Sequence, residues 1–192
     1  MKKLLLTMLG LLLSLPAIAR DFEYTYEGQT ITYTVIDEDA KTCKTKDGES
    51  GKAGNTILGD LTLPFNPIDR STTFTLTELG NNAFSACANL NSIYIPESVN
   101  YIGEWAFYNC LRLTSISIPN AVTYIGDYAF LNCSGLTKAE FASIEHFCSI
   151  KIGNFYSNPL YYAHTLYING EEVKEVTIPE AVTSIGDYAF YN

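Results

Sequence analysis

Apolar residues recur along much of this chain at a spacing of 23 residues. The spacing holds for three residue types in three consecutive units: Gly80, Gly103 and Gly126; Phe84, Phe107 and Phe130; Cys87, Cys110 and Cys133. Residues 91–113 and 114–136 are identical at 13 of 23 positions, and residues 115–132 and 175–192 at 12 of 18. Self-similarity at a fixed period indicates stacked units that bury a continuous core between them.

Each unit opens with a pattern that predicts a short strand. Ile93 and Ile95 alternate with Ser92 and Tyr94, so one face of the strand is expected to be buried and the other open. Pro96 follows at once. It is expected to end the strand, because proline has no N–H to donate to a neighbouring strand.

The remainder of each unit predicts a second extended segment and then a turn. Val99 and Ile102 are expected to point inward, and Gly103 to turn the chain with a positive φ. Glu104 is expected to cap a short helical turn that carries Ala106 and Phe107. A strand-opened period of 23 residues favours a β-rich leucine-rich-repeat solenoid over helix-pair repeats.

The consensus LxxIxIPxxVxxIGxxAFxxC resembles the BspA-like leucine-rich repeat of secreted bacterial surface proteins. The resemblance covers residues 61–192 and is strongest between residues 91 and 136. It implies a curved solenoid with parallel strands on the concave side and short helical turns on the convex side. It also implies adhesion to host matrix, to cell surfaces or to other microbes, without catalytic residues.

The first 19 residues are predicted to be a signal peptide. Lys2 and Lys3 precede an apolar run over residues 4–15, and Ala17-Ile18-Ala19 forms a small-residue cleavage motif. The apolar run is shorter than the ~20 residues that a membrane-spanning helix needs. We therefore expect export, with an uncleaved anchor as the alternative.

The mature chain is predicted to have two parts. Residues 20–60 are expected to form an N-terminal β cap, with a hairpin and then a mobile polar loop. The repeats are expected over residues 61–192, in units near 61–90, 91–113, 114–136, an irregular 137–174 and a truncated 175–192. Because the last unit stops before its cysteine, we expect the chain to be an N-terminal fragment of a longer protein.

Two segments interrupt the period. Residues 65–79 are expected to add a hairpin to the first coil. In the irregular unit, Ser143 is expected to cap a short helix, residues 157–164 to form a turn-rich loop, and Asn169-Gly170 to turn a hairpin. A protruding insertion of this kind is a place where binding specificity can be set.

The charge of the chain excludes some partners. Without Lys2 and Lys3, the mature chain has 10 basic and 21 acidic residues, a formal charge of −11. Such a surface repels phosphate, so nucleic acid and anionic membranes are poor partners. We expect a monomer that associates with a membrane only through an unseen anchor.

The sequence predicts neither an enzyme nor a cofactor or metal site. Cys87, Cys110 and Cys133 are expected to be buried thiols, because stacked side chains that point the same way miss the Cβ separation of a disulfide. The state of Cys43 and Cys148 stays open. His146 and Cys148 stand two residues apart, a spacing that does not bring two side chains of a helix together.

We interpret the chain as an exported bacterial binding protein of the cell surface, or alternatively as a repeat stalk that presents a missing C-terminal domain. The expected ligand is a host extracellular-matrix or cell-surface protein, or a glycan of a host or microbe. Tyrosine is abundant, as it is in many binding surfaces. The candidate surfaces are the open strand face (Ser92, Tyr94, Ser115, Ser117, Lys138, Glu140 and Thr177) and the insertion (Tyr161, Tyr162 and Tyr167).

Overall fold

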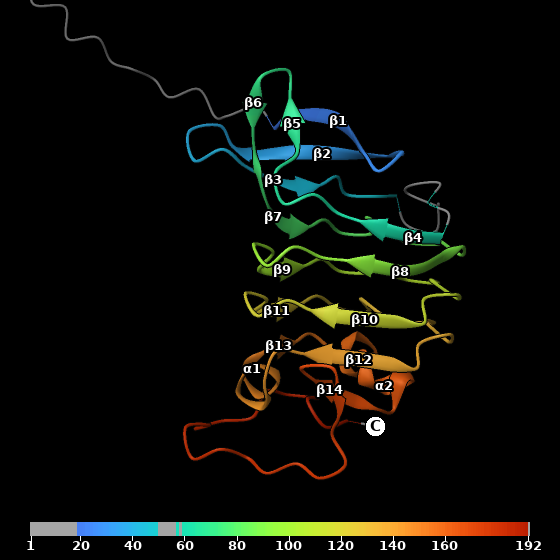
Figure 1. The fold of residues 1–192 in the computed structure, drawn as a ribbon, viewed down its shortest axis with the longest axis vertical. Helices are drawn as coiled ribbons and strands as arrows, with labels where there is room; N and C mark the ends of the chain where they lie inside the picture. The colour runs from blue at the N-terminus through green and yellow to red at the C-terminus, as the bar shows by residue number, and fades with distance from the viewer. Residues whose placement is uncertain (1–18, 50–56, 58, 192) are drawn as a thin grey trace, which may run out of the picture.

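The chain winds into coils that stack one on the next along a single axis (Figure 1). The computed structural model describes residues 19–49, 57 and 59–191. Two sheets run along the stack, and a small separate hairpin consists of β5 (Ile68–Asp69) and β6 (Thr72–Thr73). The predicted signal peptide lies almost wholly outside the described residues.

The first sheet has six strands in the order β15-β14-β12-β10-β8-β4. Its strands are β4 (Gly59–Thr62), β8 (Leu90–Tyr94), β10 (Ser115–Ile118), β12 (Lys138–Phe141), β14 (Leu166–Ile168) and β15 (Glu171–Glu172). All pairs are parallel except β14 with β15. Ile116 lies beside Ile93 on one side and Ala139 on the other, so the inward row of each strand continues into the next coil.

The second sheet has seven strands in the order β1-β2-β3-β7-β9-β11-β13. Its strands are β1 (Asp21–Tyr26), β2 (Gln29–Asp37), β3 (Thr42–Thr45), β7 (Thr75–Leu79), β9 (Tyr101–Ile102), β11 (Tyr124–Ile125) and β13 (Lys151–Ile152). In this sheet, β3, β7, β9, β11 and β13 are parallel to one another. The described chain therefore has the predicted β-rich repeat architecture, with a strand of each regular coil in each sheet.

The third side of a regular coil consists of single hydrogen-bonded turns. Tyr108 N–H donates to Trp105 O (3.1 Å) and Cys110 N–H to Phe107 O (3.1 Å). Trp105 and Asn109 have a positive φ, which separates these turns and prevents a continuous helix. The N–H groups of Trp105, Phe107 and Asn109 instead donate to carbonyl groups of the next coil at 2.8–3.0 Å. These turns thus join neighbouring coils as a strand ladder does.

Gly103 does not have the positive φ that the sequence predicted. A Cβ atom at this position would lie 2.6 Å from the backbone N of Asn81 in the preceding coil. A Cβ at Gly126 would meet the backbone N of Glu104 at 2.5 Å in the same way. Glycine is needed here because the backbones of two coils approach closely at the corner, not because of its left-handed conformation.

The N-terminal strands extend the second sheet beyond the first coil. The predicted hairpin is present, with β1 antiparallel to β2. The mobile loop expected after it is wrong in part, because β3 pairs with β2 on one side and with β7 of the first coil on the other. Cys43 and Thr45 of β3 are fully buried. The strand ladder therefore runs without interruption from the cap into the repeats.

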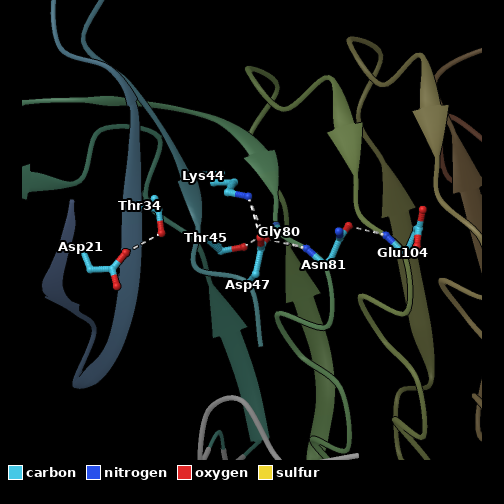
Figure 2. Close-up of polar contacts among 8 residues, drawn as sticks. All are labelled: Asp21, Thr34, Lys44, Thr45, Asp47, Gly80, Asn81 and Glu104. Carbon is cyan, nitrogen blue, oxygen red and sulfur yellow. Dashed lines mark hydrogen bonds and ion pairs between the residues drawn. The ribbon is translucent and has the colours of Figure 1, made fainter. Parts of the chain in front are cut away.

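Side chains of the cap also bond to the first two coil corners (Figure 2). Asp47 Oδ1 accepts from Lys44 Nζ (2.8 Å) and from the N–H of Asn81 (2.9 Å). Asn81 Oδ1 accepts in turn from the N–H of Glu104 at 2.9 Å. Thr45 Oγ1 accepts from the N–H of Gly80 at 2.9 Å. These bonds satisfy backbone donors at the corners that would otherwise lose their partners on folding.

The irregular unit contains two helices where the sequence predicted one. The first, α1 (Ile144–Ser149), begins after Ser143, whose hydroxyl accepts from the N–H of His146 as predicted. The second, α2 (Leu160–Ala163), replaces the loop expected over residues 157–164 and follows a 3-10 turn at Phe155–Ser157. The predicted Asn169-Gly170 turn joins β14 to β15, and both of its residues have a positive φ.

Where this unit departs from the repeat, two side chains make the hydrogen bonds that join it to the neighbouring coils. The phenol oxygen of Tyr162 accepts from the N–H of Asn132 at 2.8 Å. The amide Nδ2 of Asn158 donates to the carbonyl groups of Tyr188 and Ala189, both at 2.8 Å. In the regular coils, backbone atoms make the corresponding bonds.

All five cysteines are free and buried. The Sγ of Cys110 lies 3.1 Å from Phe84 O, and that of Cys133 lies 3.1 Å from Phe107 O, so each thiol donates to the preceding coil. Burial raises the pKa of the Cys43 and Cys133 thiols to about 12. The stacked thiols predicted for the repeat are confirmed, and Cys43 and Cys148 are also unbridged.

Candidate functional site

The open side of the six-stranded sheet forms one continuous surface, called here the strand face. It consists of the outward side chains of β4, β8, β10, β12 and β14. Ser92 lies beside Ser115, which lies beside Lys138. In the adjacent row, Ser117 lies beside Glu140, which lies beside Tyr167. The parallel register therefore brings together six residues that the sequence assigned to this face (Ser92, Tyr94, Ser115, Ser117, Lys138 and Glu140).

Neutral and charged side chains both lie on the strand face. Tyr94 is 57% exposed, and Ser92 Oγ donates to Asp60 Oδ1 at 2.7 Å. Toward the C-terminus, Lys138 Nζ lies 2.9 Å from Glu140 Oε2 and 4.6 Å from the centre of the Tyr167 ring. The ammonium group is thus held between a carboxylate and an aromatic face, and Tyr94 is the exposed aromatic residue of β8.

The structure corrects the placement of two predicted residues. Tyr167 was assigned to the protruding insertion but lies in β14, next to Glu140 on the strand face. Thr177 was assigned to the strand face but lies in no strand and is exposed. The reason is that the insertion supplies its own strand, β14, which takes the place beside β12 that the repeat pattern gave to residues around Thr177.

Tyr161 and Tyr162 belong to a second surface on the turn side of the coils. Both are half-buried residues of α2. The Tyr161 ring lies 5.2 Å from that of Tyr156, and the Tyr156 ring lies 6.2 Å from that of Tyr128. The Tyr128 ring stacks on Trp105 at 4.4 Å. Rings from three successive units are therefore in contact.

We call this set of rings the aromatic row. Its members are Trp105, Tyr108, Tyr128, Phe155, Tyr156, Tyr161, Tyr162, Tyr188 and Tyr191. The repeat spacing identifies Trp105, Tyr128 and Tyr188 as equivalent positions. Phe155 and Tyr156 were missed as site residues, because the irregular unit breaks the spacing that would have aligned them. Tyr191 was missed although it follows the spacing, at the position of Tyr108.

His146 and Cys148 are the pair considered for nucleophilic catalysis. Their surroundings disfavour the charged imidazolium and thiolate that such catalysis needs. Cys148 is buried, and burial raises its thiol pKa, whereas an activated thiolate needs a lowered pKa. The His146 pKa is lowered, first by burial, which disfavours the imidazolium. Among the described residues, no three His, Cys, Asp or Glu side chains come together as potential metal ligands. Helices long and apolar enough to cross a membrane are likewise absent from residues 19–49, 57 and 59–191.

The repeat motif and the two-sheet stack define a leucine-rich-repeat protein. The family model described as the BspA type leucine rich repeat region matches residues 68–166 and 162–192. The chain therefore belongs to the BspA-type leucine-rich-repeat family. No curated protein matches the chain in sequence.

Several solved leucine-rich-repeat structures are similar to this chain. A protein of Bacteroides ovatus is 27% identical with a TM-score of 0.57, and the match covers 88% of this chain and 38% of that protein. A protein of Bacteroides capillosus is 24% identical with a TM-score of 0.56, covering 77% and 99%. The T. pallidum leucine-rich-repeat protein is 24% identical with a TM-score of 0.56, covering 87% and 66%. The chain thus spans little more than a third of the B. ovatus protein.

Proposed function

We propose that this protein is an exported binding protein of the bacterial cell surface, with the strand face as its ligand-binding surface. The observation that carries the proposal is the continuous open face across five strands, with the exposed Tyr94 on β8. Tyrosine offers a large contact area and a polar tip at low entropic cost, so it suits protein and glycan ligands. Membership of the BspA-type family supports this function, and so does the signal peptide predicted over residues 1–19.

The proposed ligand is a protein or glycan of a host or of another microbe. The acidic surface of the chain argues against nucleic acid. A folded repeat surface can bind without any chemistry, because its ligand needs only complementary shape and hydrogen bonds. The aromatic row is the second candidate surface for the same role.

A pair of matched variants tests the strand face. Mature protein would be applied to immobilised matrix proteins, mucins and glycans, as wild type and as Tyr94→Glu/Ser117→Glu. The control is Leu111→Glu/Ser134→Glu, which adds the same charge at two exposed positions on the turn side. We expect saturable binding that only the strand-face variant loses, with unchanged circular dichroism. Equal binding by both variants would exclude the strand face.

The alternative function is a repeat stalk that presents another domain. It predicts that folded, monomeric protein binds no member of the panel. The two functions are therefore separated by the wild-type protein alone, before any variant is made.

A further inference from the structure

A cavity of 380 Å3 lies between α1 and the exposed segment 181–184, away from the strand face. Its volume falls within the ~300–1,000 Å3 that small-molecule sites occupy. One wall is formed by Glu145 and His146 of α1, and the opposite wall by Val182, Thr183 and Ser184. Asn120 of the preceding coil lines a third side.

The cavity exists because a helix replaces an extended corner in the stack. In the regular coils the corner valines, Val99 and Val122, are fully buried by the neighbouring coil. Val182 is the equivalent residue of the last coil and is only half-buried, because among the described residues it has a neighbour on the α1 side alone. The last coil is attached at the far end of α1, where Gly186 N–H donates to Cys148 O at 2.7 Å. The corner at 181–184 is thereby held apart from the helix.

One wall of the cavity contains a buried acceptor without a partner. His146 is 8% exposed, and its Nε2 lies 3.0 Å from Val122 O. A carbonyl oxygen can only accept, so Nε2 carries the proton and Nδ1 is an acceptor. Nδ1 is buried and makes no hydrogen bond within the described chain. Because Nδ1 has no surface open to solvent, a ligand in the cavity cannot bond to it, and the hydrogen-bonding groups of the site come from the other lining residues.

The other lining groups define the chemistry of a ligand. Asn120, Thr183 and Ser184 offer amide and hydroxyl groups that both donate and accept, and Glu145 offers a carboxylate that accepts. No Lys or Arg lines the cavity, so an anion would be repelled by Glu145 without compensation. Val182 supplies an apolar patch in the same wall. A neutral molecule with several hydroxyl groups and a small apolar face matches this set of groups.

We propose that this cavity binds one sugar unit of a neutral saccharide. Ligand hydroxyl groups would bond to Asn120, Thr183, Ser184 and Glu145, and the C–H face of the sugar would contact Val182. The site is separate from the strand face. It can therefore exist whether or not the strand face binds a partner.

The two histidines of the chain provide a direct test. His146 lines the cavity, whereas His164 is exposed at the end of α2 and serves as an internal reference. The mature protein would be titrated with glucose, galactose, mannose and N-acetylglucosamine, while the imidazole 15N signals are followed by NMR. We expect at least one sugar to shift the His146 signals saturably and to leave His164 unchanged. No saturable shift with any sugar, or equal shifts at both histidines, would overturn the proposal and leave only water in the cavity.

Matched variants locate the site. Thr183→Val/Ser184→Ala removes two hydroxyl groups from exposed residues and should weaken sugar binding at least tenfold. The control is Thr123→Val, at the position equivalent to Thr183 in the last regular coil and outside the cavity lining. It should bind as wild type does. Binding that survives the double variant would place the sugar elsewhere and would refute this site, while leaving the test of the strand face unaffected.

Discussion

Two coils of this protein have nearly the same sequence but very different burial. Phe130, Ile125 and Ile118 of the coil at residues 114–136 are at most 1% exposed. The equivalent residues of the last coil, Phe190, Ile185 and Ile178, are 47%, 49% and 39% exposed. The two segments are identical at 12 of 18 positions, so the difference does not come from the amino acids.

Within the described residues, the difference comes from the number of neighbouring coils. Phe130 stacks on Phe107 of the preceding coil at 5.2 Å and is covered on its other side by the irregular unit. Phe190 contacts Phe147 edge-on at 5.0 Å, and about half of its surface is in contact with solvent. Strands are also absent from the described part of the last coil. The stability of a repeat thus depends on its own sequence and also on the interfaces with the coils next to it.

The largest expected effect comes from truncating the equivalent phenylalanines. Phe130→Ala should lower the free energy of unfolding by about 3–5 kcal/mol, because it leaves a cavity between two coils. Phe190→Ala should cost about 1 kcal/mol, because half of that ring is already exposed. Urea unfolding followed by circular dichroism measures both. Equal losses of unfolding free energy would show that Phe190 is as well buried in solution as Phe130. The comparison of the two coils would then be wrong.

The corner glycines provide a second, smaller test. Gly126→Ala would place a Cβ atom 2.5 Å from the backbone N of Glu104 and should cost about 1–3 kcal/mol, because coils on both sides resist movement. Gly186→Ala would bring a Cβ to 2.4 Å from Ile150 O, but within the described residues the last coil packs on the irregular unit alone and can move away from it. We expect a small loss of global stability there, and faster hydrogen exchange in residues 181–191. The matched control is Gly170→Ala, where a Cβ has space but the positive φ is strained.

The smallest expected effect concerns His146, which lies between the two coils. Burial lowers its imidazole pKa, and the Val122 carbonyl and the Glu97 carboxylate offset this only in part. A lowered pKa in the folded state means that the stabilisation is complete above the pKa of the unfolded imidazole, ~6.5, and is lost as pH falls below it. Urea midpoints at pH 7.5 and 5.5 should therefore differ more for wild type than for His146→Gln. The same difference in both proteins would assign the acid sensitivity to groups other than His146.

The sequence predicted the parts of the fold that depend on local patterns. The alternation of Ile93 with Ser92 and Tyr94 located β8 and its open face, and Asn169-Gly170 located a hairpin. It also located the cap of α1 at Ser143. These predictions succeeded because turn chemistry, capping and strand alternation involve residues close together in the chain.

Other features could not be predicted because they depend on partners far away in the chain. β3 is a short segment inside a polar, Gly-rich stretch that was interpreted as a loop, yet β2 and β7 pair with it on both sides. Thr177 follows the repeat pattern, yet β14 occupies the place beside β12. The residues around Thr177 contain no local signal that β14 pairs with β12 in their place.

The sequence by itself determined the repeat, the inward positions of each coil and the strand face that it leaves open. Tertiary structure alone decided how far each inward position is buried, which strand follows β12, and how Tyr162 and Asn158 replace backbone groups in the irregular unit. It also decided that a cavity lies between α1 and the last coil. The physical reason is that a 23-residue period encodes which side chains face inward, whereas burial and pairing are set by the coil that packs against them.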